Sequence, residues 1–359
     1  MALFARYLNR LFVARFALML AGLVALASLL DMMAHADEVV AGDGALALWR
    51  YFALRLPVIV SKLLPFSVLI AALLTLVSLV RHGEIVVMLG AGVSPWRLVL
   101  AFLPAVGLLG AAHFWLDDAA VPPAAAELRA WAAADYGAAA ESGAMAESDR
   151  RTWLREGNDV IRLGTLDTGD SARLTDVTIF QRDVAGILTV RIDAATVVLE
   201  AGAWVLYDVT RYDVAANAVE TIARLPWAGR LRPDLLSTLM AHPRELSLGD
   251  VWRYLGAPEF GSRPLYVYET WFNRKIVVPL ASLLMVLIAV PLSQRFQRHG
   301  GAATTLTLGI AIGFCFFVFD GFALAVGEAG LVPPVLAAWA PSLAFAAAGA
   351  ALGFYGERR

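Results

Sequence analysis

Long runs of hydrophobic residues alternate along this chain with short polar stretches. A helix needs about 20 mostly apolar residues to cross the hydrocarbon core of a bilayer, and six runs of roughly this length occur. They fall at residues 11–30, 56–80, 98–116, 276–292, 302–326 and 335–355. The pattern predicts six membrane-spanning helices in two groups of three, separated by a long polar segment.

The polar segment between the two groups has the pattern of short β-strands. Residues 117–150 are rich in alanine and predict a mostly helical stalk, after which apolar and polar residues alternate between glycines. Candidate strands are 151–156, 158–163, 174–182, 186–200, 203–213 and 218–225. This many strands in so short a segment predict a sandwich or jelly roll. A helical connector follows at 233–256, where Ser247 is a candidate N-cap.

The predicted fold is therefore an α-helical membrane protein with six transmembrane helices (3+3) and an inserted all-β, jelly-roll-like domain. We expect residues 1–116 to hold the first three helices, 117–275 the stalk, β-domain and connector, and 276–359 the last three helices. Of the 60 charged residues (29 basic and 31 acidic), 40 lie between Asp117 and Lys275. That uneven distribution excludes a single soluble domain. The net charge of −2 offers no basic surface for nucleic acid.

Basic residues in the short loops orient the predicted helices, because Lys and Arg of such loops remain in the cytoplasm. One side of the spans carries nine arginines, namely Arg6, Arg10, Arg15, Arg81, Arg97, Arg295, Arg298, Arg358 and Arg359. The short loops on the other side, 31–50 and 327–334, contain a single Lys or Arg residue, Arg50. We therefore expect a multi-pass protein of the bacterial inner membrane with both termini in the cytoplasm and residues 117–275 in the periplasm.

A cleaved signal peptide is an alternative interpretation of the N-terminus. Arg6 to Arg15 would form its basic region, residues 16–30 its apolar region, and Ala34-His35-Ala36 its cleavage site. Cleavage would leave five spans and an external N-terminus. The apolar run is at the long limit for a signal peptide, which favours a retained helix.

The sequence lacks the motifs of the common catalytic and metal sites. Lys62 follows Ser61 and Lys275 follows Arg274, so there is no Walker A loop to bind ATP phosphates. No histidine is followed by glutamate, as a zinc-binding HExxH helix requires, and there is no Gly-x-Ser-x-Gly motif. The single cysteine, Cys315, excludes an intrachain disulfide. We expect a non-catalytic protein without a metal or cofactor.

The loop between the second and third runs contains a candidate amphipathic helix at residues 83–90. Gly90 and Pro95 mark its end, and its first turn carries a carboxylate, Glu84, among apolar residues. Such a helix can dock into a groove of a soluble partner. It can also lie in the headgroup region as a membrane anchor, and these residues alone favour that second interpretation.

Three charged residues within the spans are candidates for lipid contact. Lys62 and Arg55 lie near the outer end of the second span, where each can bind an anionic headgroup or extend to the membrane surface. Asp320 in the fifth span can form a lateral contact, pair with a base such as Lys62, or remain a hydrated interfacial acid.

One predicted strand is apolar on both of its faces. Trp204-Val205-Leu206-Tyr207 is typical either of a strand between two packed layers or of one lining an apolar cavity, where Leu206 would contact lipid. The packed strand is the commoner arrangement.

The chain resembles the lipopolysaccharide export permeases of the LptF/LptG family over essentially its whole length. The resemblance rests on the order of several motifs: Arg81 to Gly92, Pro243-Arg244-Glu245-Leu246-Ser247, Val318-Phe319-Asp320, Gly330-Leu331-Val332-Pro333-Pro334 and Ala340-Pro341-Ser342. The last span, with its double proline, is more similar to LptG than to LptF.

The resemblance implies the transmembrane subunit of an ABC exporter for lipopolysaccharide. Its implied partners are a cytoplasmic LptB-like ATPase dimer, an LptF-like permease paralogue, and LptC-like and LptA-like periplasmic proteins. It also implies that Glu84, with Val87, Met88 and Gly90 beside it, couples the ATPase to the membrane helices, which reverses the preference for a headgroup anchor. Other functions left open are a membrane-anchored periplasmic scaffold or sensor without transport, a permease for another envelope lipid, and the LptF paralogue itself.

Overall fold

The computed structural model of the chain divides into two compact units, Met1–Tyr136 with Glu269–Arg359, and Gly137–Tyr268. The structure describes residues 2–43, 47–90, 95–135, 152–167, 173–183, 185–200, 203–227, 229, 243–256, 260–261, 263–295 and 302–357. The second unit is shorter than the predicted insert at 117–275, because helical structure continues past residue 117 on one side and begins before residue 275 on the other.

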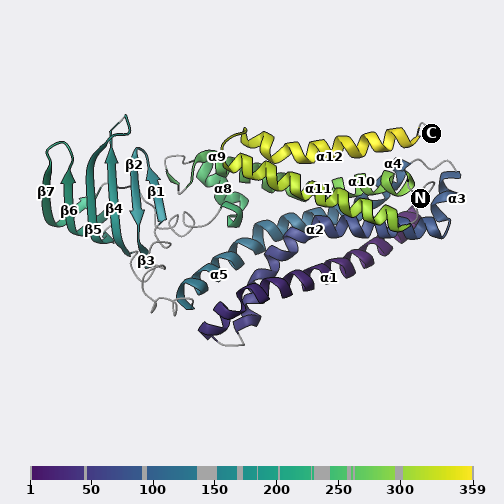
Figure 1. Cartoon of the computed structure of the whole chain (residues 1–359), viewed down its shortest axis with the longest axis horizontal. Coiled ribbons are helices and arrows are strands. Elements are labelled where there is room, and N and C mark those ends of the chain that lie inside the picture. Colours follow the sequence, from purple (N-terminus) through teal and green to yellow (C-terminus); the bar gives the residue numbers. More distant parts are fainter. Residues whose placement is uncertain are drawn as a thin grey trace. The chain divides into compact units, whose positions relative to one another are not determined.

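Within the described residues, six helical stretches are long and apolar enough to cross a membrane, which confirms the predicted number of spans. They contain α1 (Ala2–Asp43), α2 (Ala47–Arg81), α4 (Pro95–Trp115), α9 (Leu265–Val277) with α10 (Ala281–Arg295), α11 (Ala302–Glu328) and α12 (Pro334–Glu357) (Figure 1). The short helix α3 (Glu84–Gly90) lies between α2 and α4. The start of α1, α3 and the end of α12 lie at the same end of the bundle (Figure 1).

The third and fourth spans are longer than their apolar runs and contain irregular turns. A π-helical turn, η1 (Leu116–Ala120), joins α4 to α5 (Val121–Asp135), and a 3₁₀ turn, η4 (Val278–Leu280), joins α9 to α10 around Pro279. The third apolar run was expected to end at residue 116, just before Asp117, and the fourth to begin at residue 276, just after Lys275. These two charges continue the helices because they pair with each other inside the bundle.

Glycines let α11 pack closely against the central helix α2. Gly309 and Gly313 lie one turn apart: a Cβ at Gly309 would meet the side chain of Leu73, and one at Gly313 would meet Leu69 and the ring of Phe66. Small residues at this spacing allow membrane helices to approach each other closely. The first half of α11 therefore packs closely against α2, with no room for larger side chains at these two positions.

Replacing Gly313 with valine is expected to lower the free energy of unfolding by about 1–3 kcal/mol, because overpacking moves buried neighbours out of their rotamers. Gly321 on the same helix has open space around it, so Gly321→Val is a matched control that should leave stability nearly unchanged. Denaturant titration in mixed micelles measures both variants. Equal losses in the two would contradict close packing at Gly313.

The second unit contains an antiparallel sheet. Its strands are β1 (Thr152–Glu156), β2 (Asp159–Leu163), β3 (Thr165–Asp167), β4 (Arg173–Arg182), β5 (Leu188–Glu200), β6 (Ala203–Asp213), β7 (Ala218–Trp227) and β8 (Phe260–Gly261). The order across the sheet is β7-β6-β5-β4-β2-β1-β8, with β3 beside β4 (Figure 1). All six predicted strands are present, and hydrogen bonds join the described strands into one continuous sheet. The inserted all-β domain is confirmed.

The predicted connector is helical where the structure describes it. It contains η3 (Pro243–Glu245) and α8 (Leu248–Leu255), while residues 233–242, like residues 136–151 of the stalk and first strand, lie outside the described part. Ser247 is the N-cap of α8, as predicted: its Oγ accepts a hydrogen bond from the Asp250 amide at 3.1 Å, and the Asp250 carboxylate accepts one from the Ser247 amide at 3.2 Å. This capping box satisfies two amides at the start of the helix.

Candidate functional site

Helix α3 presents one face to the bundle and another away from it. After α2, Gly83 turns the chain with a φ of +76°. Ile85 is fully buried in the bundle core, and Met88, one turn later, packs partly against the same core. Val87 is 72% exposed, and Glu84 is half-buried and accepts a long hydrogen bond of 3.4 Å from the Tyr7 hydroxyl. The helix therefore offers an apolar side chain and a carboxylate to a partner, and Gly90 is exposed at its end.

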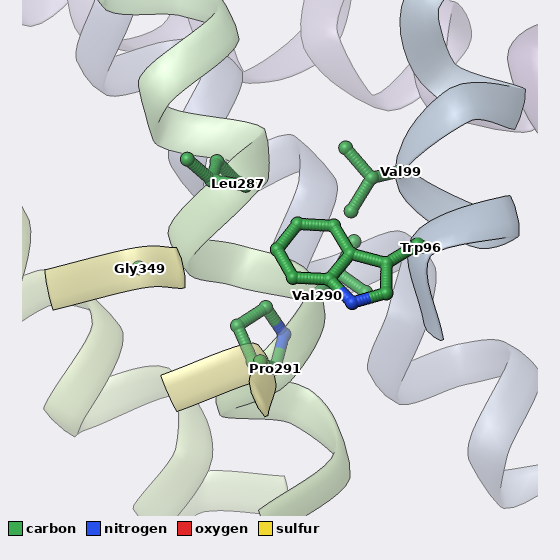
Figure 2. Close-up of a pocket in the computed structure, with 7 residues that line it drawn as sticks. Trp96, Val99, Leu287, Val290, Pro291 and Gly349 are labelled. Atoms are coloured by element: carbon green, nitrogen blue, oxygen red, sulfur yellow. The ribbon is translucent and has the colours of Figure 1, made fainter. Parts of the chain in front are cut away.

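The first turn of α4 is also fixed to the bundle. An apolar pocket between α4, α10 and α12 is lined by Trp96, Val99, Leu287, Val290, Pro291, Gly349 and Gly353. Figure 2 shows the indole ring of Trp96 reaching towards Leu287 and Val290 of α10. A Cβ at Gly353 would approach this ring to 3.0 Å, and the ring also contacts Phe354 at a centroid distance of 5.3 Å. A movement of α3 would therefore reach the bundle through two contacts, Ile85 in its core and Trp96 at the start of α4.

Lys62 and Arg55, two of the predicted lipid contacts, lie two turns apart on one face of α2. Lys62 is exposed. Arg55 is half-buried and binds Asp31 of α1 through Nε at 3.0 Å and Nη2 at 2.9 Å, and Asp31 accepts a third hydrogen bond from Tyr51. Arg55 thus joins the first two spans, so a lipid phosphate would have to replace Asp31 to bind it.

Of the alternatives left open for Asp320, the structure shows a pair with a base, which is Arg274 of α9. The two nitrogens Nη1 and Nη2 of Arg274 donate to the two carboxylate oxygens at 2.9 and 2.6 Å. The pair is largely buried. Trp271 of α9 is also buried, and its indole donates to Glu328 at 2.6 Å. Two polar contacts therefore join the fourth and fifth spans.

A second buried polar group joins the second, third and fourth spans, and it was not predicted. The side chain of Lys275 is only 3% exposed, and its Nζ lies 3.3 Å from Oδ2 of Asp117. The other oxygen of Asp117 accepts a hydrogen bond from Ser61 at 3.0 Å, and Ser61 lies 3.2 Å from His113 Nε2. Asp117 lies in the π-helical turn η1, and such turns recur at functional positions in helices.

Leu206, the predicted lipid contact of the β-domain, is fully buried on β6 opposite Val197, which is buried as well. Its neighbours Trp204 and Val205 are also buried, so both faces of this strand are covered. This is the packed arrangement that the sequence favoured. Contact between Leu206 and lipid stays a prediction that requires the interior of the domain to open.

Next to this buried stretch, the sheet carries a charged surface group. The hydroxyl of Tyr207 donates to one oxygen of Glu200, and Arg224 Nη2 donates to the other at 2.7 Å. The hydrogen bond from Tyr207, together with Arg224, lowers the pKa of the Glu200 carboxyl below its usual value. Glu200 therefore favours folding above the ordinary pKa of a glutamate, and this contribution is lost as the pH falls through the lowered pKa.

The chemistry of these sites is that of binding and coupling. Among the described residues, no three histidine, cysteine, aspartate or glutamate side chains come together as metal ligands would. Sequence reasoning found α3 and the charges of α2 and α11, but it missed Arg274, Lys275, Asp117 and His113. The available signal was that Lys275 is one of only two lysines, at the edge of an apolar run.

Comparisons with known proteins cover nearly the whole chain. The profile of the family described as "Lipopolysaccharide export system permease LptF/LptG" matches residues 6–354. The "Lipopolysaccharide export system permease protein LptG" of Haemophilus influenzae is 22% identical over 350 residues, which are 95% of this chain and 95% of that protein. The protein of the same name from Escherichia coli (strain K12) is 25% identical over 340 residues, 89% of this chain and 90% of that protein.

Proposed function

This chain belongs to the LptF/LptG family of lipopolysaccharide export permeases, as an LptG-like, non-catalytic transmembrane subunit of the Lpt ABC transporter, and we propose how its parts divide that work. The helical unit, Met1–Tyr136 with Glu269–Arg359, forms the membrane part in the bacterial inner membrane, and the unit Gly137–Tyr268 forms the periplasmic part. Both termini and α3 face the cytoplasm, because the arginines that flank the spans gather on that side.

An LptB-like ATPase dimer binds α3 of this chain and the matching helix of an LptF-like paralogue. The observation that carries this proposal is the two-faced geometry of α3: Ile85 and Met88 fix it to the bundle, while Glu84 and Val87 remain available to a groove. Gly90 ends the helix and leaves its C-terminal turn accessible. Closure of the ATPase dimer on ATP supplies the energy through its differential affinity for the closed state, since this chain supplies no ATP site.

LptC-like and LptA-like proteins continue the path in the periplasm. The edge strand β7 pairs only with β6 among the described strands, and most of its side chains are exposed. An unpaired strand edge is a template for an added strand. We assign the docking of a periplasmic β-protein to this edge.

Lipopolysaccharide enters from the membrane near Lys62 and Arg55 and leaves through the β-domain. Lys62 is exposed on α2 and contacts a lipid phosphate, and Arg55 does so when it exchanges Asp31 for that phosphate. Leu206 contacts the acyl chains once the interior of the β-domain opens. Asp320 acts indirectly, through its pair with Arg274.

Photo-crosslinking in cells that produce labelled lipopolysaccharide tests this path. A crosslinker at Lys62 is expected to capture the lipid in an ATPase-dependent manner, and one at Leu206 to capture it later. Trp115 is the control position, because it is also exposed but lies on another span, α4. Purification of the same chain should recover the ATPase subunit. Lipid captured equally at Trp115 and Lys62, or no ATPase in the complex, would contradict the proposal.

A further inference from the structure

The buried face of α11 changes character along the helix. In its first half, Thr305, Gly309, Gly313 and Phe316 are buried at helical spacing, and the glycines pack against α2. Asp320 is the next position on this face. From there outwards, the contacts to α9 are polar, while the large side chains Val318, Phe319 and Phe322 on the other faces are exposed.

Three polar contacts join the outer parts of α11 and α12 to α9, and we call them the polar seam. They are Arg274–Asp320, Trp271–Glu328 at 2.6 Å, and Asn273–Trp339, in which the Trp339 indole donates to Asn273 Oδ1 at 3.3 Å. A Cβ at Gly327 would meet the side chain of Ala337, so the outer ends of α11 and α12 are packed closely on each other. These two helices therefore meet α9 as one hairpin.

Another residue of α9, Lys275, joins this helix to the second and third spans through a more deeply buried contact. Lys275, the residue after Arg274, binds Asp117, which Ser61 of α2 also binds. Lys275 is almost completely buried, so it cannot gain water or lipid as a new partner without unpacking the core. Arg274 and Asp320 each keep some exposure, so an incoming group can reach them.

We propose that the polar seam is a latch, which holds the α11–α12 hairpin against α9 in the resting state and opens when an anionic amphiphile enters, while Lys275–Asp117 stays closed. This rests on the proposed function, because a lipid phosphate is the acceptor that replaces Asp320 at Arg274. Arg binds carboxylate and phosphate with the same two-nitrogen geometry. In an apolar environment, a charge released without a new partner is costly, so the latch stays closed until the ligand arrives. The phosphate then pairs with Arg274, and the released Asp320 carboxylate, which already keeps some exposure, becomes hydrated.

Spin labels on α11 measure the latch directly in the complete transporter in nanodiscs. The native Cys315 is exposed in α11 and reports the middle of the helix, and Ala325→Cys in a Cys315→Ser chain reports its outer half. Asp320→Asn and Arg274→Gln are expected to raise the mobile fraction at position 325 about twofold by shifting the population of the open state. The label at Cys315, beside the glycine contacts, should change little.

The controls separate the latch from general damage and from the proposed function. Glu328→Gln keeps an acceptor for Trp271 and should resemble the wild type, and the exchanged pair Arg274→Asp with Asp320→Arg should restore low mobility at 325. Lipopolysaccharide should raise mobility in the wild type but add nothing to Asp320→Asn. Unchanged mobility in Asp320→Asn would overturn the latch even if export is lost. Raised mobility in a chain that moves no lipopolysaccharide would support the latch and contradict the proposed function.

Discussion

Replacing Glu84 with arginine is expected to abolish lipopolysaccharide export while the chain still folds and inserts. Glu84 lies on the accessible side of α3, and among the described residues its only hydrogen bond within the chain is the long one from Tyr7, so the bundle does not need it. Losing one partner of a desolvated charge pair costs about 2–5 kcal/mol of docking energy, which is at least about 30-fold in affinity. A reversed charge adds repulsion. Co-purified ATPase and lipopolysaccharide release by reconstituted transporter measure both effects.

Two further variants, one on α1 and one on α3, sharpen this prediction. Tyr7→Phe removes the contact of Glu84 within the chain and should export lipid nearly as well as the wild type. Val87→Asp places a charge on the exposed apolar position and should weaken ATPase binding without unfolding the bundle. If Glu84→Arg retains its ATPase and its export, α3 is a membrane-surface anchor and the coupling assignment is wrong.

The positions of the secondary-structure elements could be predicted because they follow from local hydrophobic patterns. The expected strand at 203–213 coincides with β6 (Ala203–Asp213), and the six apolar runs all lie in helices. The strands β3 and β8 were missed because they are only three and two residues long, too short for an alternating pattern. β8 exists because β1, about a hundred residues earlier, binds it.

The partners of the charged residues could not be predicted from local patterns. Asp117 and Lys275 each lie at the edge of an apolar run, where the usual interpretation is a hydrated helix end. Their pairing joins residues 158 positions apart, and only the packing of the third and fourth spans brings them together. For the same reason the sequence left several roles open for Asp320, and only the packing of α9 against α11 gives it Arg274 as a partner.

The second large effect is expected at Lys275. Lys275→Met should lower the free energy of unfolding by about 3–5 kcal/mol, because it leaves the Asp117 carboxylate without its buried base. The double variant Lys275→Met with Asp117→Asn should recover most of this loss, since the charge that needed compensation is then also absent. Denaturant titration in mixed micelles gives the free energies of unfolding of the wild type, Lys275→Met and the double variant.

Lys62 provides the matched control for that double-variant cycle, because it is the only other lysine and its side chain is exposed. Lys62→Met should change stability by no more than about 1 kcal/mol, because an exposed charge contributes little even where it is paired, yet it should reduce lipid capture. The two lysines would then separate: Lys275 maintains the bundle, and Lys62 contacts the ligand. If Lys275→Met is as stable as the double variant, Asp117 is satisfied without Lys275, through Ser61 or water, and the fixed side of α9 does not depend on this pair.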